Sequence, residues 1–209
     1  MKPEDVTTVV VGAISTNCYL FGSDTEVCVV DPGGDADLIF EAVRGRKITH
    51  VLLTHSHYDH ILALNALIEA NPSLIVGVHR LEEHCPTRPE CNLSGLVGEP
   101  FAVAKTPELL LDDGMVVEIA GHTIEVIHTP GHTVGGCSFL SGDVLFSGDT
   151  LFHSSVGRAD LPGGDENVLK QSVRRLYELP GKTVVFPGHM NRTKISWERN
   201  HNPYVRLSE

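Results

Sequence analysis

The chain has 209 residues, of which 41% are hydrophobic, and a formal net charge of −11 at pH 7. This length suffices for one sizeable core, and we expect a single domain over residues 1–209 because no low-complexity segment divides the chain. The acidic balance argues against nucleic acid or an anionic membrane as a partner, since both are bound through clustered Lys and Arg.

The cysteine content and the N-terminal sequence indicate the cellular compartment. Five cysteines without a C-x-x-C pair indicate buried or free thiols in a reducing compartment, with Cys85 and Cys91 as the one pair that we consider. The first residues lack the apolar core of a signal peptide, and no apolar run reaches the roughly 18 residues that span a bilayer. We therefore expect a cytoplasmic protein without a membrane partner, and the oligomeric state stays open.

The first half of the chain predicts strands followed by alternating helices and strands. Three β-rich runs separated by turn residues predict an antiparallel meander over residues 6–11, 17–21 and 26–30. Asp35 is placed to cap a helix that ends near Gly45. A β-α-β pattern follows, with the strand at 48–53, the helix at 61–70 and the next strand at 74–78.

The second half repeats the β-rich pattern after an irregular stretch. Residues 80–107 lack periodicity and contain four prolines, so we expect a surface excursion there. Four further strands are predicted at 115–119, 123–127, 137–140 and 144–147. Asp165 is placed to cap a helix, and 183–186 is the last predicted strand. Two β-rich halves with outer helices predict an α/β fold, a four-layer αββα sandwich.

Four potential metal ligands lie between the strand at 48–53 and the next helix: His55, His57, Asp59 and His60. In extended backbone, residues two apart face the same way, so His55 and His57 can bind one cation. Asp59 and His60 project separately and can bind a second cation close to the first. Imidazole and carboxylate ligands suit zinc, iron and manganese.

Three more candidates each follow a predicted strand and a glycine: His132, Asp149 and His189. Together with the His55–His60 motif, these residues resemble the metallo-β-lactamase superfamily. The resemblance is strongest to its short glyoxalase II-like (hydroxyacylglutathione hydrolase-like) members. It covers most of the chain, from Asp31-Pro32-Gly33 to His189. The resemblance implies two divalent metal ions, zinc first, with iron or manganese as alternatives. It assigns His55, His57 and His132 to the first metal ion. It assigns Asp59, His60 and His189 to the second ion, and Asp149 to both.

The resemblance also implies a reaction. The expected activity is that of a metal-dependent hydrolase, a thioesterase that cleaves S-lactoylglutathione or a related hydroxyacyl thioester with a metal-bound hydroxide. Asp59 would orient that hydroxide or accept its proton. Arg158 either anchors a substrate carboxylate or forms a salt bridge with Asp160. Only 20 residues follow His189, so we expect no C-terminal helical glutathione-binding domain of the kind that long glyoxalase II enzymes carry.

One alternative belongs to another class of enzyme. A persulfide dioxygenase of the same superfamily keeps the motif and uses a single iron, for which the matching residues here are His55, His132 and Asp149. Oxygen consumption with a persulfide would favour the dioxygenase, and thiol release from a thioester would favour the hydrolase. We expect Asp31 to support a motif histidine, and we expect the histidines outside the pattern to be ordinary.

Overall fold

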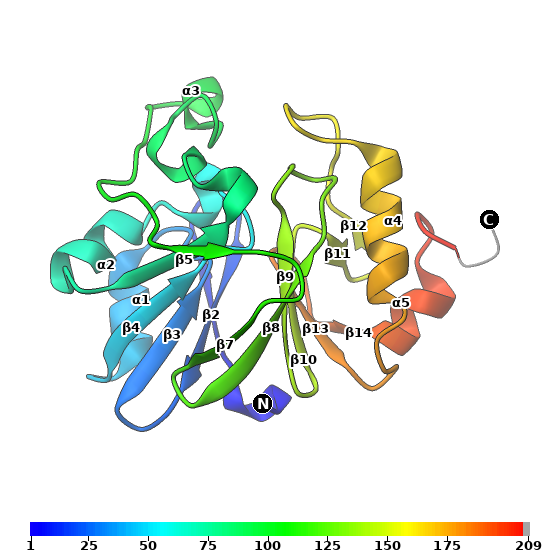
Figure 1. The fold of residues 1–209 in the computed structure, drawn as a ribbon, viewed down its shortest axis with the longest axis horizontal. Helices are drawn as coiled ribbons and strands as arrows, with labels where there is room; N and C mark the ends of the chain where they lie inside the picture. Colours follow the sequence, from blue (N-terminus) through cyan, green and yellow to red (C-terminus); the bar gives the residue numbers. More distant parts are fainter. Residues whose placement is uncertain (207–209) are drawn as a thin grey trace.

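The computed structural model describes residues 1–206 and arranges them in four layers, helix, sheet, sheet and helix (Figure 1). One six-stranded sheet has the order β1-β2-β3-β4-β5-β6, and the other has the order β14-β13-β10-β9-β8-β7. Strands β11 and β12 form a small separate pair. The predicted αββα sandwich is confirmed.

The first sheet joins the antiparallel meander to parallel strands. Its strands are β1 (Thr7–Val11), β2 (Thr16–Gly22), β3 (Glu26–Val30), β4 (Lys47–Leu52), β5 (Ile75–His79) and β6 (Leu109–Leu111). Pairing is antiparallel from β1 to β3 and parallel from β3 to β6. Helices α1 (Ala36–Val43) and α2 (Leu64–Ala70) connect β3 to β4 and β4 to β5. Because β3, β4 and β5 run parallel, the loops after these strands meet at one edge of the sheet.

The second sheet is mostly antiparallel. It contains β7 (Val116–Ile119), β8 (His122–His128), β9 (Cys137–Ser141), β10 (Val144–Gly148), β13 (Val184–Pro187) and β14 (Thr193–Lys194), while β11 (Leu151–Phe152) and β12 (Ser155–Val156) lie beside it. Helices α4 (Glu166–Leu176) and α5 (Ile195–His201) cover its outer face (Figure 1). The prediction that the strand at 183–186 is the last one is wrong, because β14 follows it and pairs with β13.

Three apolar clusters fill the spaces between the four layers. The sheets meet on an aromatic cluster in which the Tyr19 and Phe146 ring centroids lie 5.3 Å apart and those of Phe146 and Phe186 5.7 Å apart. Ile39 of α1 belongs to the cluster behind the first sheet, and Val173 of α4 to the cluster behind the second. The central strands β2, β3 and β10 are therefore buried on both faces, which holds the strand ends in fixed positions.

Local sequence accounts for some helix starts and not for others. Asp165 caps α4 as predicted, since its Oδ1 accepts hydrogen bonds from the backbone N–H groups of Asn167 and Val168. Asp35 does not cap the start of α1, because its carboxylate instead accepts a hydrogen bond from the Gly12 N–H at 2.8 Å. The helix predicted over 61–70 begins only at Leu64, after a 3₁₀ turn at Tyr58–His60.

The excursion between β5 and β6 is irregular, as predicted, and contains 3₁₀ turns at Arg80–Glu82 and Cys85–Thr87 and the one-turn helix α3 (Ser94–Val97). Cys85 and Cys91 form a disulfide, so the expectation of free thiols is wrong for this pair. The loop folds back far enough to bring their Cα atoms to 4.9 Å. The other three cysteines are free and buried. Within residues 1–206, no helix combines the length and the apolar character needed to cross a bilayer.

Candidate metal centre

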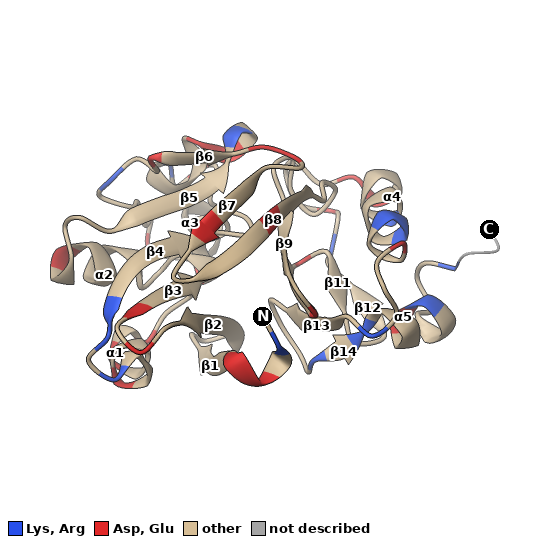
Figure 2. Cartoon of the chain, turned by 60° about the horizontal axis from the view of Figure 1, so that its bottom comes forward, with Lys and Arg blue, Asp and Glu red and all other residues tan. Residues whose placement is uncertain are grey.

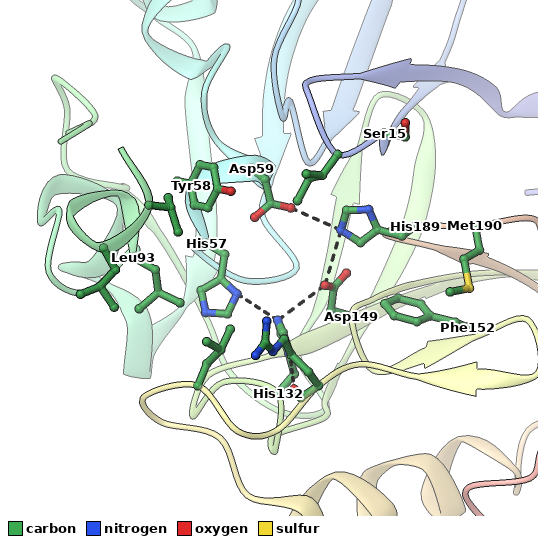
Figure 3. A pocket seen from close by; sticks show the side chains of 15 residues that line it. Ser15, His57, Tyr58, Asp59, Leu93, His132, Asp149, Phe152, His189 and Met190 are labelled. Carbon is green, nitrogen blue, oxygen red and sulfur yellow. Dashed lines mark hydrogen bonds and ion pairs between the residues drawn. The ribbon is translucent and has the colours of Figure 1, made fainter. Parts of the chain in front are cut away.

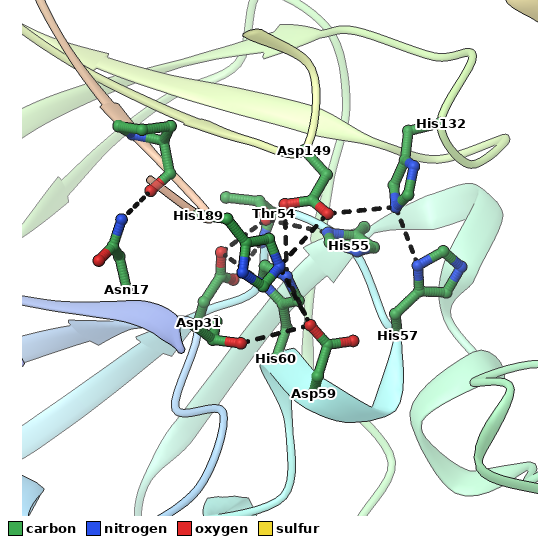
Figure 4. Close-up of polar contacts among 12 residues, drawn as sticks. Asn17, Asp31, Thr54, His55, His57, Asp59, His60, His132, Asp149 and His189 are labelled. Carbon is green, nitrogen blue, oxygen red and sulfur yellow. Dashed lines mark hydrogen bonds and ion pairs between the residues drawn. The ribbon is translucent and has the colours of Figure 1, made fainter. Parts of the chain in front are cut away.

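The seven candidate ligands lie together at one edge of the two sheets (Figure 4). The motif residues follow β4, His132 lies in the loop after β8, Asp149 follows β10 and His189 follows β13. His55, His57, Asp59, His60 and His132 are buried, whereas Asp149 and His189 are partly exposed. Every ligand position named from the sequence is thus part of one cluster.

The cluster divides into two groups of ligand atoms. Within each group the atoms lie within 4.8 Å of one another; the groups are His55, His57 and His132, and Asp59, His60 and His189. His55, His60 and Asp149 meet the same criterion and link the two groups. Asp149 touches both groups. Its Oδ2 lies 3.6 Å from Nε2 of His132 and also 3.6 Å from Nε2 of His189.

Distances and missing partners indicate that this donor set fits metal ions. Nδ1 of His57 and Nε2 of His132 face each other at 2.9 Å, and Nε2 of His189 lies 3.3 Å from Oδ2 of Asp59. Two donors on one tetrahedral zinc are about 3.3 Å apart. Nε2 of His55 and Oδ1 of Asp149 are buried without a hydrogen-bond partner among residues 1–206. Because an unpaired buried polar atom costs free energy, the arrangement is consistent with a cation as the missing partner.

Asp31 orients two motif histidines from behind. Its Oδ1 accepts a hydrogen bond from the Thr54 N–H at 2.8 Å, and its Oδ2 accepts one from the Thr54 hydroxyl at 2.7 Å. Since the hydroxyl donates to Asp31, its oxygen is left to accept a hydrogen bond from the Nδ1–H of His55, 3.2 Å away. Oδ2 of Asp31 also lies 3.0 Å from Nδ1 of His60. In both histidines Nε2 then faces the cluster, and the expected supporting role of Asp31 is confirmed in its contacts.

The ligands of the second sheet are fixed by backbone groups. The carbonyl of Arg158 accepts a hydrogen bond from Nδ1 of His132 at 2.7 Å, which leaves the Nε2 lone pair for the cluster. Buried Asn17 donates from Nδ2 to the carbonyls of Pro187 and Met190, both at 2.9 Å, and so holds the turn that carries His189 (Figure 4). The sequence did not single out Asn17, because its partners lie about 170 positions away.

Glycine next to the ligands allows close approach. A Cβ on Gly188 would lie 2.2 Å from Oδ1 of Asp149, and a Cβ on Gly148 would lie 2.3 Å from Oγ1 of Thr54. Gly148 also has φ of +47°, where side chains are disfavoured. The glycines that flank the ligands in sequence are therefore explained by space and backbone conformation.

Burial and neighbouring charges shift the pKa values of the candidate ligands in different directions. Burial, with the neighbouring histidines, lowers the pKa of His55 well below its usual value and that of His57 to about 3. Burial would raise the pKa of Asp149, but the nearby histidines outweigh it and lower the pKa to about 2. For His60 burial also opposes the shift, and three surrounding carboxylates raise its pKa. At neutral pH these shifts favour neutral imidazole at His55 and His57 and ionised carboxylate at Asp149, the forms that bind a cation.

A cavity of about 650 Å³ opens over the cluster (Figure 3). Tyr58 is among the residues that line it. Arg158 also lines the cavity, and its side chain forms two hydrogen bonds of 2.7 Å with Asp160. That pairing lowers the pKa of Asp160 to about 2. Of the two alternatives for Arg158, the salt bridge is present, and substrate binding by Arg158 stays a prediction.

Histidines outside the pattern pack on other rings. His79 and His128 stack with ring centroids 4.1 Å apart. His153 and His201 both stack on Trp197. Neither set belongs to a group of potential metal ligands among residues 1–206, and the expectation that these histidines are ordinary stays a prediction.

Relatives of similar length match nearly the whole chain. The chain is 33% identical over 200 residues to "Probable metallo-hydrolase YqgX" of Bacillus subtilis, a match that covers 93% of this chain and 94% of the relative. It is 31% identical over 206 residues to "Hydroxyacylglutathione hydrolase GloC" of Haemophilus influenzae, covering 93% and 95%.

Solved structures share the fold. A structure described as BLEG-1 B3 metallo-beta-lactamase superposes with a TM-score of 0.91 at 38% identity, covering 96% of this chain and 99% of that one. The structure of TTHA1623 in a di-iron-bound form superposes with a TM-score of 0.84 at 34% identity, covering 95% of this chain and 100% of that one. ETHE1 from Myxococcus xanthus gives 0.74 at 31%, covering 95% and 83%.

The sequence model of one family matches residues 11–189, which include all seven candidate ligands. This match, the relatives above and the four-layer fold agree with one another. The chain belongs to the metallo-beta-lactamase superfamily.

Proposed function

We propose that this protein is a metal-dependent hydrolase of glyoxalase II type that cleaves a hydroxyacyl thioester of the S-lactoylglutathione class. The observation that carries the proposal is the pair of ligand groups joined by Asp149 at the bottom of an open cavity. The hydrolase names of the relatives, one of them a hydroxyacylglutathione hydrolase, support it.

His55, His57 and His132 would hold one divalent ion, and Asp59, His60 and His189 a second, with Asp149 shared. When bound, the ions supply hydroxide at neutral pH and polarise the thioester carbonyl. Zinc, iron and manganese all suit these ligands, and iron is named for the TTHA1623 structure. Asp59 is held beside this site by the Thr16 hydroxyl, which lies 3.3 Å from Oδ2, and can accept the proton of the attacking water. Water and thioester yield a carboxylic acid and a thiol.

The free cysteines are poor candidates for a nucleophile. Burial raises the pKa of Cys18, Cys28 and Cys137, and all three are buried in the apolar interior. Inert thiols at these positions are consistent with attack by water. The reaction proposed here accordingly needs no covalent intermediate on the protein.

A small molecule is the proposed partner. Basic residues are spread over several elements, among them α4, α5 and β14 (Figure 2). A nucleic acid is bound through phosphate contacts from a concentrated basic face. The spread of positive charge and the net charge of −11 therefore support a small substrate over a nucleic acid.

The proposal is tested by thiol release. Protein loaded separately with zinc, manganese and iron is assayed with S-lactoylglutathione and with an uncharged lactoyl thioester, beside Asp59→Asn and the surface control Asp143→Asn. We expect one thiol per ester cleaved, a loss of at least a hundredfold in kcat for Asp59→Asn, and an unchanged rate for the control. Absence of thiol release with every metal would refute the proposal.

A second candidate function, the persulfide dioxygenase, is favoured by one feature of the cluster. His132 and Asp149 are in contact, and the ring centroids of His55 and His132 lie 4.8 Å apart, so two histidines and one carboxylate stand close together. Two histidines and a carboxylate with open positions are the usual ligands of non-haem iron oxygenases. Oxygen uptake with glutathione persulfide by the iron-loaded protein, without thioester cleavage, would establish this candidate instead.

A further inference from the structure

The wall of the cavity above the metal centre is apolar. Beyond the ligands and Tyr58 it is built largely from aliphatic and aromatic side chains, including Ile14, Leu93, Leu96, Val97, Phe152 and Met190. Four of these six expose about half of their surface or more: Ile14 53%, Leu96 69%, Val97 59% and Met190 58%. Exposed apolar side chains gathered around a cavity are typical of a ligand site.

This wall is held in an unfavourable backbone conformation. Ser15, Leu93 and Met190 line the cavity from three different loops, and their φ angles are +59°, +67° and +69°. Side chains in this left-handed region cost free energy, and such residues are often found at ligand sites. Hydrogen bonds maintain the conformation, since Asn17 donates to the Met190 carbonyl and the Ser94 N–H donates to Asn92 beside Leu93. The wall is therefore positioned, although its side chains are exposed.

The wall carries little positive charge for an anionic substrate. In the described part of the chain, Arg158 is the single Lys or Arg that lines the cavity. Nε and Nη2 of its guanidinium each donate a hydrogen bond of 2.7 Å to the carboxylate of Asp160. Glutathione carries two carboxylates, whereas this single guanidinium is already paired with the carboxylate of Asp160.

Resting on the proposed thioester hydrolysis, we propose that the substrate of this site carries an uncharged, apolar arm that packs on Leu93, Leu96, Val97, Ile14 and Met190. The arm belongs either to the acyl group or to the thiol, and in both cases it takes the place that the charged glutathione tail would occupy. Specificity is then set by burial of hydrocarbon, at about 0.8 kcal/mol per methylene, which is about fourfold in kcat/KM.

The test compares two series of thioesters on the zinc-loaded protein. In the first the acyl chain grows from acetyl to octanoyl on N-acetylcysteamine, and in the second a lactoyl group is carried by alkyl thiols of growing length. S-lactoylglutathione is the charged reference. We expect kcat/KM to rise about fourfold per methylene in one of the series until the wall is covered. A flat response in both series, with S-lactoylglutathione preferred, would overturn the inference.

Variants locate the effect. Leu96→Asn combined with Val97→Asn should flatten the chain-length dependence, because both side chains are exposed and the fold does not depend on them. Leu81→Asn is the matched control, since Leu81 is 59% exposed and lies outside the cavity lining. If the control flattens the dependence equally, the wall is not the cause and the inference fails.

A binding measurement separates this inference from the proposed function. S-alkyl thioethers of N-acetylcysteamine have no thioester carbonyl to hydrolyse, and their affinity is measured by calorimetry. We expect the octyl compound to bind at least tenfold more tightly than the methyl compound, and the double variant to remove this difference. That result without any thioester cleavage would retain the apolar site and reject the proposed function. Equal affinities would reject the apolar site even if thioesters are cleaved.

Discussion

The floor of the cavity and its rim are built in different ways. The floor consists of the seven clustered candidate ligands, which follow strand ends and are held by Asp31, Thr54 and Asn17. The rim is the part of the apolar wall that is formed by Ile14, Leu93, Leu96, Val97 and Met190. These residues lie outside the strands, and all except Leu93 expose their side chains. Chemistry and substrate preference are thus assigned to separate segments, so each should change without the other.

The largest expected effect comes from the floor. Asp149→Ala removes the carboxylate that touches both ligand groups. We expect loss of metal from both groups and a fall in kcat of more than a hundredfold, beyond the 10- to 100-fold seen when only a supporting residue is changed. Metal per chain by elemental analysis, together with thiol release, checks this expectation.

The surface variant Asp143→Asn serves as the control, because Asp143 pairs with Lys182 away from the cavity. Retention of two metal ions and full activity by Asp149→Ala would show that the floor is not a shared site.

A smaller effect is expected when a support of the floor is changed. Asp31→Asn keeps the shape of the side chain but removes the charge beside His60 and one acceptor for Thr54. We expect metal affinity to fall about 10- to 100-fold and the free energy of unfolding to fall by about 1–3 kcal/mol. Competition with a chelator and denaturant unfolding measure the two effects.

Asp35→Asn is the matched control, because Asp35 also has a positive φ but its carboxylate accepts a hydrogen bond from the Gly12 N–H and not from a motif histidine. Its metal affinity should equal that of the wild type. An equal loss in both variants would mean that Asp31 acts through backbone conformation and not through the histidines.

The floor was predictable from the sequence because its signals are local. His55, His57, Asp59 and His60 lie within six positions, and strand-then-glycine patterns marked the other three ligands. Strand periodicity placed the longer strands of both sheets for the same reason, whereas the short strands β6, β11, β12 and β14 were not predicted. The start of α1 at Asp35 was predicted correctly, but its side chain does not cap the helix because the carboxylate accepts a hydrogen bond from Gly12, a partner 23 positions away that propensity does not report.

The rim was not predictable because its conformation depends on distant contacts. The Tyr58 N–H donates to the Asn92 carbonyl at 2.8 Å, and the Asn92 side chain donates to the Phe101 carbonyl at 2.9 Å, which shapes the loop that presents Leu93. Nothing in the local sequence at 80–107 signals these bonds. The same folding back brings Cys85 to Cys91, a pair that spacing alone did not favour.

The smallest expected effect tests whether the rim is separable. Replacing both Cys85 and Cys91 by Ser removes a disulfide between residues six positions apart. From loop entropy, a disulfide of this span contributes about 2 kcal/mol to the free energy of unfolding. We expect the melting temperature to fall by about 6 °C, with metal content unchanged. Calorimetry and elemental analysis are the readouts.

Wild type treated with a reductant should behave as the Cys85→Ser, Cys91→Ser variant does, and it provides the comparison for side effects of the serines. Loss of metal from either sample would contradict the separation of rim and floor.

The central claim, that two adjacent ions serve one thioester-cleaving site, is tested most directly by titrating metal-free protein with zinc while following thiol release from a lactoyl thioester. We expect the rate of thiol release to rise until two ions are bound per chain and then to stay constant. A rate that is complete at one ion per chain, or no thiol release at any loading, would contradict it.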